Sequence, residues 1–332
     1  MSSSIFHKNK VSDVHLRGNV ADVLDCIAYA PGPRKISDAE ASLCIRLIER
    51  CQTIAQRDFM FKDDGVHYRG YTDDMSVDGR WYRLKLLRSH PPSLEELPTP
   101  LAPSVIKTLM SERVKRGGLM LISGAPGAGK TTTGSSVVVS RLRRFGGVAY
   151  TLEDPPEMPL SGWHGEGICH QGQVPAGGNE VGWEEAFRGI LRSQPAASTP
   201  MLFVGELRDG GAVRACIRAA QNGFLVIATS FGTQLTEGIT SVAELAADRK
   251  ESTLPIVYAN LGTVLKVVVH QQLRAGRISA SILAIPEDSP QSSMIRKALI
   301  HDLRGQVEYQ QNIIFAATQT SPDGIDLMEH RV

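Results

Sequence analysis

The chain has 332 residues, of which 42% are hydrophobic and 21% are charged. This composition excludes collagen-like, coiled-coil and wholly disordered proteins, and the length predicts about two domains of ordinary size. The formal net charge is +1, so the protein as a whole has no strong electrostatic attraction for nucleic acid or anionic lipid.

The N-terminal part of the chain is predicted to be an α+β domain. Residues 38–57 carry apolar side chains at helical spacing and follow a plausible N-cap, Ser37 or Asp38. Residues 65–71 and 80–88 are predicted strands, and apolar and polar side chains alternate in the second of them.

A proline-rich segment separates this part from the rest. Five prolines lie within the 14 residues from 90 to 103, where they remove backbone donors and disfavour helix in the residues before them. We therefore predict an N-terminal α+β domain, a proline-rich linker, a second domain and a C-terminal helical tail, at residues 1–90, 91–104, 105–290 and 291–332. We expect the last residues of the tail to be loosely packed, because residues 318–324 are mostly turn formers.

The second domain is predicted to have an α/β fold with a mostly parallel sheet. Short, continuous apolar runs alternate there with helical stretches, and such runs are typical of strands that are buried on both faces. The predicted strands lie at residues 119–123, 148–152, 201–204, 225–229 and 264–269.

A complete phosphate-binding motif follows the first of these strands. Residues 124–131 match G-x-x-x-x-G-K-[ST] and precede a predicted helix over residues 132–142. Small residues let backbone N–H groups close around a phosphate at the positive end of the helix, the lysine reaches the β- and γ-phosphates, and the next hydroxyl completes a Mg²⁺ shell. The alternative is a glycine-rich turn with an exposed lysine. We predict ATP and Mg²⁺ as cofactors, with a binding set of Gly124, Ala125, Pro126, Gly127, Ala128, Gly129, Lys130, Thr131 and Thr132.

Two glutamates end apolar runs, where the carboxyl ends of parallel strands deliver side chains to a binding crevice. Glu153 ends one run, and Glu206 follows another run and Gly205 in the form of a Walker B element. A carboxylate in this place can hold Mg²⁺ or orient and deprotonate the attacking water. We predict that both are catalytic and that Glu206 joins Thr131 at the metal, whereas the alternative for Glu153 is a helix-capping or surface acid.

Other kinds of site have weaker support. The five cysteines are odd in number and form no C-x-x-C pair, which predicts reduced thiols rather than disulfides or zinc. His164, Cys169 and His170 offer three possible metal ligands without a fourth, which is a weak metal signal. No run approaches 18 apolar residues, so we expect a cytoplasmic protein without a membrane span.

Together the motifs resemble those of the secretion ATPase superfamily, whose members power type II secretion, type IV pilus assembly and retraction, and type IV secretion or conjugation. The sequence Phe-Val-Gly-Glu-Leu-Arg-Asp at residues 203–209 is a specific signature of that family. The resemblance covers most of residues 11–285 and is carried mainly by residues 11–16, 124–131, 151–157, 203–209, 219–226 and 268–284.

The resemblance implies a PAS-like N-terminal lobe followed by a RecA-like ATPase domain, in a hexameric ring of two-lobed subunits that bind ATP between the lobes. Glu153 matches the family's catalytic glutamate and Glu206 its Walker B glutamate. Arg83 and Arg88 match arginines of the N-terminal lobe that approach the nucleotide phosphates, and the alternative for them is a solvated strand face. The family also implies a place at the inner membrane beside secretion or pilus platform proteins.

The chain departs from the family in its His box. Phe224 and Phe231 stand where the family usually has histidines, while Thr229 remains. A phenyl ring neither donates a hydrogen bond nor titrates, so this box cannot sense the γ-phosphate in the usual way. The zinc-binding cysteine module of some secretion-type members is also absent, and the segment between Arg83 and Arg88 is shorter than in retraction ATPases. These departures together favour an ATPase for type IV secretion or conjugation, and we keep open a type IV pilus motor and a non-hydrolysing ATP-binding ring subunit. A nucleic-acid translocase is disfavoured by the near-zero net charge and the lack of an aromatic-rich basic surface run.

Overall fold

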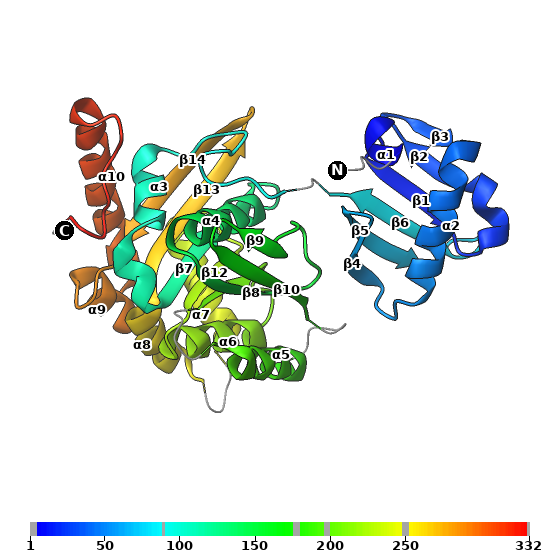
Figure 1. Cartoon of the computed structure of the whole chain (residues 1–332). Helices are drawn as coiled ribbons and strands as arrows, with labels where there is room; N and C mark the ends of the chain where they lie inside the picture. Colours follow the sequence, from blue (N-terminus) through cyan, green and yellow to red (C-terminus); the bar gives the residue numbers. More distant parts are fainter. Residues whose placement is uncertain (1–4, 88–89, 175–179, 196–199, 248–251, 331–332) are drawn as a thin grey trace. The chain divides into compact units, whose positions relative to one another are not determined.

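The structure is a computed structural model that describes the chain except for residues 1–4, 88–89, 175–179, 196–199, 248–251 and 331–332 (Figure 1). The chain divides into two compact units. The first comprises Met1–His90, Asp154–Pro159 and Gln173–Gly177, and the second comprises Pro91–Glu153, Leu160–Gly172 and Gly178–Val332.

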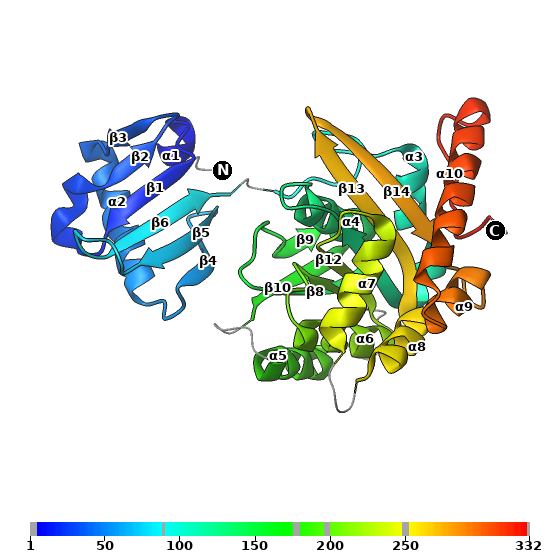
Figure 2. The same ribbon diagram turned by 180° about the vertical axis from the view of Figure 1, so that it is seen from behind.

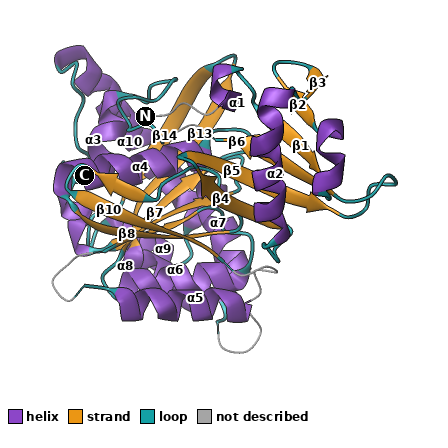
Figure 3. Cartoon of the chain, turned by 45° about the vertical axis from the view of Figure 1, so that its right-hand side comes forward, coloured by secondary structure: helices purple, strands orange, loops and turns teal. Residues whose placement is uncertain are grey.

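The first unit contains an antiparallel sheet, with six strands in the described part of the chain, in the order β3-β2-β1-β6-β5-β4. Helix α2 crosses one face of this sheet (Figure 3) and buries its apolar side against it. This arrangement confirms the predicted α+β lobe. Its elements are α1 (Ile5–Lys8), β1 (Asp13–Arg17), η1 (Val20–Asp25), β2 (Ile27–Tyr29), β3 (Pro33–Lys35), α2 (Asp38–Gln52), β4 (Asp58–Asp63), β5 (Val66–Asp73) and β6 (Trp81–Leu86).

Helix α2 is shorter than the sequence predicts. It begins after Ser37, whose backbone N–H donates to the Glu40 carboxylate at 2.8 Å, as in a capping box. It ends at Gln52 instead of residue 57, because the N–H and the hydroxyl of Thr53 both donate to the Arg50 carbonyl, at 3.2 and 2.8 Å.

The second unit contains a mixed, mostly parallel sheet, with eight described strands in the order β14-β13-β7-β12-β11-β8-β10-β9. Strands β13, β7, β12, β11 and β8 run parallel, while β14 and β9 pair antiparallel with their neighbours. All five predicted apolar runs are strands. The strands are β7 (Gly118–Ser123), β8 (Gly147–Glu153), β9 (Gly162–His164), β10 (Gly167–Gln173), β11 (Met201–Val204), β12 (Leu225–Ser230), β13 (Leu265–Arg274) and β14 (Arg277–Ala284).

Helices cover both faces of this sheet. Alternate side chains of β7, such as Met120 and Ile122, share a core with Val138 and Leu142 of α4, as the two-residue repeat of a strand requires. Helix α7 lies on the opposite face, toward the viewer in Figure 2. The helices are α3 (Pro103–Leu109), η2 (Glu112–Arg116), α4 (Lys130–Phe145), α5 (Glu180–Ser193), α6 (Gly210–Gln221), α7 (Leu235–Ala246), α8 (Leu254–Val264), α9 (Pro290–Arg296), η3 (Ile300–Asp302) and α10 (Leu303–Thr320). Among the described helices, none has the length and apolar character needed to cross a bilayer.

Two segments pack more tightly than their composition suggests. Leu94, Leu97 and Leu101, in the stretch predicted as a linker, are buried in the core of the second unit. The expectation of a loosely packed C-terminus is wrong, because Leu327 and Met328 are buried in the same core. The backbone there is fixed to α3, where the N–H of Leu327 donates to the Thr108 hydroxyl at 3.1 Å.

Candidate nucleotide-binding site

The predicted phosphate loop connects the end of β7 to the start of α4. Gly127 and Gly129 have φ angles of +76° and +85°, a backbone conformation that a side chain disfavours. At Gly124 a Cβ atom would lie 2.5 Å from the Gln271 carbonyl oxygen, so a larger residue would push the loop away from β13. The glycines of the motif therefore serve both the turn itself and its close packing on the sheet.

Lys130 folds back over the loop that precedes it. Its Nζ donates to the carbonyl oxygens of Gly124 at 3.0 Å and Ala125 at 3.2 Å, and only 7% of the residue is exposed. Glu206 Oε1 lies 3.9 Å from the same nitrogen. The alternative of an exposed lysine is therefore wrong, and the ammonium group is held at the mouth of the loop, beside the half-buried Thr131.

Glu153 is the last residue of β8 and is 1% exposed. Its Oε1 accepts a hydrogen bond from Gln171 Nε2 of β10 at 2.8 Å. A Cβ atom at Gly205 would lie 3.3 Å from Glu153 Cγ, so this carboxylate lies beside the backbone that leads to Glu206. Burial, together with the Glu153 charge, raises the pKa of the nearby Cys169 thiol. The structure thus places Glu153 in the interior, unlike a surface acid.

Glu206 follows β11 and is partly exposed, with 33% of its side chain accessible. Its Oε2 accepts from Arg208 Nε at 2.6 Å, while its Oε1 is the atom that faces Lys130. Asp209 instead caps α6, since its Oδ1 accepts from the Ala212 N–H at 2.9 Å. Arg208 and Asp209 therefore have separate partners.

The His-box phenylalanines occupy different environments. Phe224 is fully buried and packs edge-on against Phe187, with 6.0 Å between ring centroids. Phe231 follows the end of β12 and is 47% exposed. Thr229 donates its hydroxyl to the Gly205 carbonyl, which connects β12 to the segment that carries Glu206. Phe224 is thus a core residue, and Thr229 supports the Walker B segment through the backbone.

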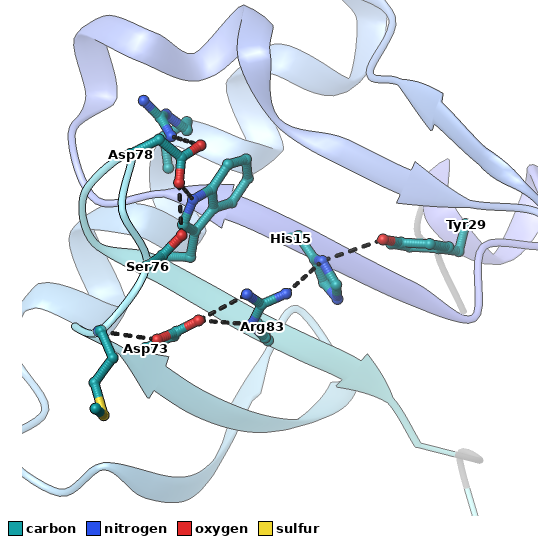
Figure 4. Close-up of polar contacts among 9 residues, drawn as sticks. His15, Tyr29, Asp73, Ser76, Asp78 and Arg83 are labelled. Carbon is teal, nitrogen blue, oxygen red and sulfur yellow. Dashed lines mark hydrogen bonds and ion pairs between the residues drawn. The ribbon is translucent and has the colours of Figure 1, made fainter.

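Arg83 lies on β6 of the first unit and has carboxylate and imidazole neighbours (Figure 4). Its Nε and Nη2 donate to Asp73 Oδ2 at 3.2 and 2.7 Å, and its Nη1 lies 3.3 Å from His15 Nδ1. The Arg83 guanidinium lowers the pKa of Asp73. With 42% of its side chain accessible, Arg83 remains reachable by an anion. Arg88 lies outside the described residues.

The second half of β13 contributes two side chains that the sequence did not single out for this site. His270 Nδ1 lies 3.2 Å from the hydroxyl of Ser123, the residue before the phosphate loop. Gln271 Nε2 donates to the Ala128 carbonyl inside the loop at 2.6 Å. Gln171 was missed in the same way, because no local pattern connects it to Glu153.

The weak metal signal at His164, Cys169 and His170 does not correspond to a cluster. His164 Nε2 pairs with the Leu160 carbonyl at 2.8 Å, Cys169 is buried in the hydrophobic core, and the His170 ring stacks on Tyr150. In the part of the chain that the structure describes, no group of three or more His, Cys, Asp or Glu side chains is placed to hold a metal ion.

The residues of the loop fit a Mg²⁺–nucleotide. A cradle of left-handed glycines leads into a long helix, and the buried ammonium group donates to two loop carbonyls that phosphate oxygens can replace. The hydroxyl of Thr131 and the accessible carboxylate of Glu206 are oxygen ligands of the kind that Mg²⁺ prefers.

Sequence comparisons identify relatives of this chain. A family model described as Type II/IV secretion system protein matches residues 84–281, which is more than half of the chain. The uncharacterized protein YggR of Escherichia coli is 28% identical over 250 residues, covering 75% of this chain and 70% of YggR. The type IV pilus retraction ATPase PilT of Pseudomonas aeruginosa is 28% identical over 173 residues, covering 51% of this chain and 47% of PilT.

Solved structures share the fold. A crystal structure of the pilus retraction motor PilT with bound ADP matches with a TM-score of 0.67 and 20% identity, covering 97% of this chain and 92% of that one. The ATPase DotB of Legionella pneumophila matches with a TM-score of 0.64 and 19% identity, covering 91% and 85%. The chain therefore belongs to the type II/IV secretion system protein family, within the secretion ATPase superfamily that its motifs resemble.

Proposed function

We propose that this protein is a Mg²⁺-dependent ATPase that energises a type IV secretion or conjugation apparatus. The observation that carries the proposal is the convergence of three parts at the carboxyl edge of one parallel sheet. These parts are a complete phosphate loop, the buried Glu153 and the Walker B-type Glu206.

Bound Mg²⁺–ATP would supply the scissile phosphoanhydride and the cation that neutralises its charge. Lys130 would exchange the carbonyls of Gly124 and Ala125 for phosphate oxygens. Thr131 and Glu206 would hold the metal. Glu153 would accept the proton of the attacking water, and its contact with Gln171 fixes the carboxylate for that role.

The N-terminal lobe would add positive charge to the reaction. Arg83, and Arg88 by the same family match, would pair with phosphate oxygens, for which the planar guanidinium fork is well suited. The exposure of Arg83 supports this role. The proposal also includes a cytoplasmic homohexamer that works beside platform proteins of the inner membrane, as the family resemblance implies.

Two other functions stay open. A type IV pilus motor is supported by the relatedness to PilT. A non-hydrolysing, ATP-binding ring subunit is supported by the phenylalanines in the His box, of which Phe224 has become a core residue. Intact Lys130, Glu153 and Glu206 favour hydrolysis over this second alternative.

Steady-state ATP hydrolysis with Mg²⁺ tests the proposal, with wild type and Glu153→Gln measured side by side and the oligomeric state followed by light scattering. We expect turnover that falls roughly 100-fold or more in the variant, which is the usual size of a general-base effect, with nucleotide binding retained. The glutamine keeps an acceptor for Gln171, so the fold should be preserved. Tight Mg²⁺-dependent binding without any wild-type turnover would instead support the non-hydrolysing subunit.

A further inference from the structure

The second half of β13 contacts the phosphate loop at two places, at Ser123 just before the loop and at Ala128 within it. Strand β13 pairs in parallel with β7, so that His270 stands opposite Ser123. Successive side chains of a strand point to opposite faces. His270 therefore reaches Ser123 at the base of the loop on one face, while Gln271 reaches the Ala128 carbonyl at 2.6 Å on the other.

The contact between His270 and Ser123 is buried. Ser123 is 0% exposed and His270 is 6% exposed, and Gly238 of α7 packs so closely that a Cβ atom there would lie 2.8 Å from Ser123 Oγ. Burial lowers the pKa of His270, against the opposing charge of Glu237. This shift favours the neutral ring, whose Nδ1 can accept from or donate to the serine hydroxyl.

The position of Ser123 determines where the loop begins. Gly124 follows it directly, and the Gly124 carbonyl is one of the two groups that hold Lys130 Nζ. A shift of Ser123 would therefore move the Gly124 carbonyl and, with it, the ammonium group of Lys130. A loop that is fixed before the ligand arrives loses less conformational entropy on binding.

We propose that His270 is a positioning residue of the phosphate loop, which it holds in its binding conformation through the contact of Nδ1 with Ser123. This inference rests on the proposed nucleotide-binding function. Gln271 holds the same loop at the Ala128 carbonyl. The two side chains together therefore fix the loop to β13.

The test compares substitutions that keep or remove the Nδ1 contact. His270→Asn keeps a polar atom near the position of Nδ1, whereas His270→Leu has a similar size and no hydrogen-bonding group. Leucine is a better test than alanine, because His270 borders a cavity of about 340 Å³. Water from this cavity could fill the space that alanine leaves and replace the hydrogen bond of the ring. Gln272→Leu is the matched control, since its amide lies 3.4 Å from the far nitrogen of the ring, Nε2, and not at Nδ1.

The readout is the dissociation constant of a fluorescent ATP analogue with Mg²⁺, measured by titration of the full chain, with thermal unfolding recorded for every variant. We expect His270→Leu to raise this constant roughly 3- to 10-fold, the effect of one neutral hydrogen bond. His270→Asn and Gln272→Leu should stay within about twofold of wild type. Ser123→Ala also removes the 3.4 Å hydrogen bond from the hydroxyl to the Val269 carbonyl, so it should weaken binding at least as much as His270→Leu. Adding His270→Leu to Ser123→Ala should cause no further loss.

Three results would overturn the inference. The first is wild-type affinity in a folded His270→Leu, and the second is an equally weak His270→Asn. The third is full additivity of His270→Leu and Ser123→Ala, which would mean that the two side chains act independently. If His270→Leu does not fold, Ser123→Ala gives the same answer, because it removes the other partner of the contact. Failure of the proposed function has a different signature, namely wild-type binding no tighter than that of Lys130→Ala.

Discussion

Two cations that we assign to the nucleotide phosphates are held in different ways. Lys130, in the second unit, donates to two backbone carbonyls and has Glu206 at 3.9 Å. Arg83, in the first unit, gives two N–H groups to the Asp73 carboxylate at 3.2 and 2.7 Å. Carbonyl oxygens are neutral and exchange for phosphate oxygens without leaving an unpaired charge, whereas a phosphate must compete with Asp73 for Arg83. We therefore propose that Lys130 can bind phosphate directly, whereas Arg83 must first be released from Asp73.

The largest effect on nucleotide binding should come from replacing Lys130. Lys130→Ala should weaken binding of a fluorescent ATP analogue roughly 100-fold or more, because the phosphates lose a charged hydrogen-bond donor. Lys115→Ala is the matched control, since this lysine precedes β7 at the opposite edge of the sheet and lies over the Phe145 ring at 4.1 Å. Equal affinities of Lys130→Ala and wild type would contradict the phosphate-loop assignment.

A smaller effect, on turnover, is expected from replacing Arg83. Arg83→Ala should leave nucleotide binding within about twofold of wild type and slow turnover roughly 10-fold, because its guanidinium would stabilise charge that develops during the reaction. Turnover and binding are measured on the same preparations. Arg80→Ala is the control, since Arg80 pairs with Asp74 in the same lobe. A wild-type rate in Arg83→Ala would identify Arg83 as a residue of a solvated strand face.

The negative charge that holds Arg83 can also be removed. Asp73→Asn keeps the acceptor for the Met75 N–H but loses the charge that holds Arg83. If Asp73 competes with phosphate, turnover at low ATP should rise up to about fivefold, in line with the worth of a half-exposed ion pair. Asp78→Asn, which loosens the pair with Arg17, is the control. A fall in turnover like that of Arg83→Ala would show that Asp73 orients Arg83 for catalysis.

The smallest effect concerns the imidazole beside Arg83. Burial, with the Arg83 charge added, lowers the pKa of His15, while Asp13 opposes this shift. The unfolded chain therefore binds more protons than the native protein as pH falls through 6.5, the ordinary pKa of an imidazole, and the contribution of His15 to stability is lost there. Thermal unfolding from pH 7.5 to 5.5 should show a loss of stability that is smaller in His15→Phe than in wild type, since burial also lowers the pKa of His67 and His270 in both proteins. Parallel curves would contradict this.

Local patterns predicted the second unit well. Continuous apolar runs gave the five parallel strands, and the motif at residues 124–131 lies between β7 and α4 as expected. Glu153 and Glu206 follow neighbouring strands, β8 and β11, so the strand positions alone bring them together. These features depend on residues that are close in sequence or on the general geometry of parallel sheets.

Contacts between distant segments could not be predicted in this way. His270 and Ser123 are 147 residues apart, and Gln271 and Ala128 are 143 apart, so their pairing depends on the register of β13 against β7. The burial of the three leucines in residues 91–104 could not be predicted from the prolines around them. Proline restricts the backbone conformation, but it does not indicate which residues the neighbouring side chains contact. The burial of Leu327 and Met328 could not be predicted from the turn-forming residues before them for the same reason.

The buried leucines determine where this chain could be divided. A protein that begins at residue 105 would keep the phosphate loop and both glutamates, but it would lack Leu94, Leu97 and Leu101 from the core. Each missing leucine side chain leaves a cavity worth about 2–5 kcal/mol, which together is comparable to the whole stability of an ordinary domain. The second unit, excised so that it starts at Pro91, should fold, whereas a version that starts at residue 105 should aggregate.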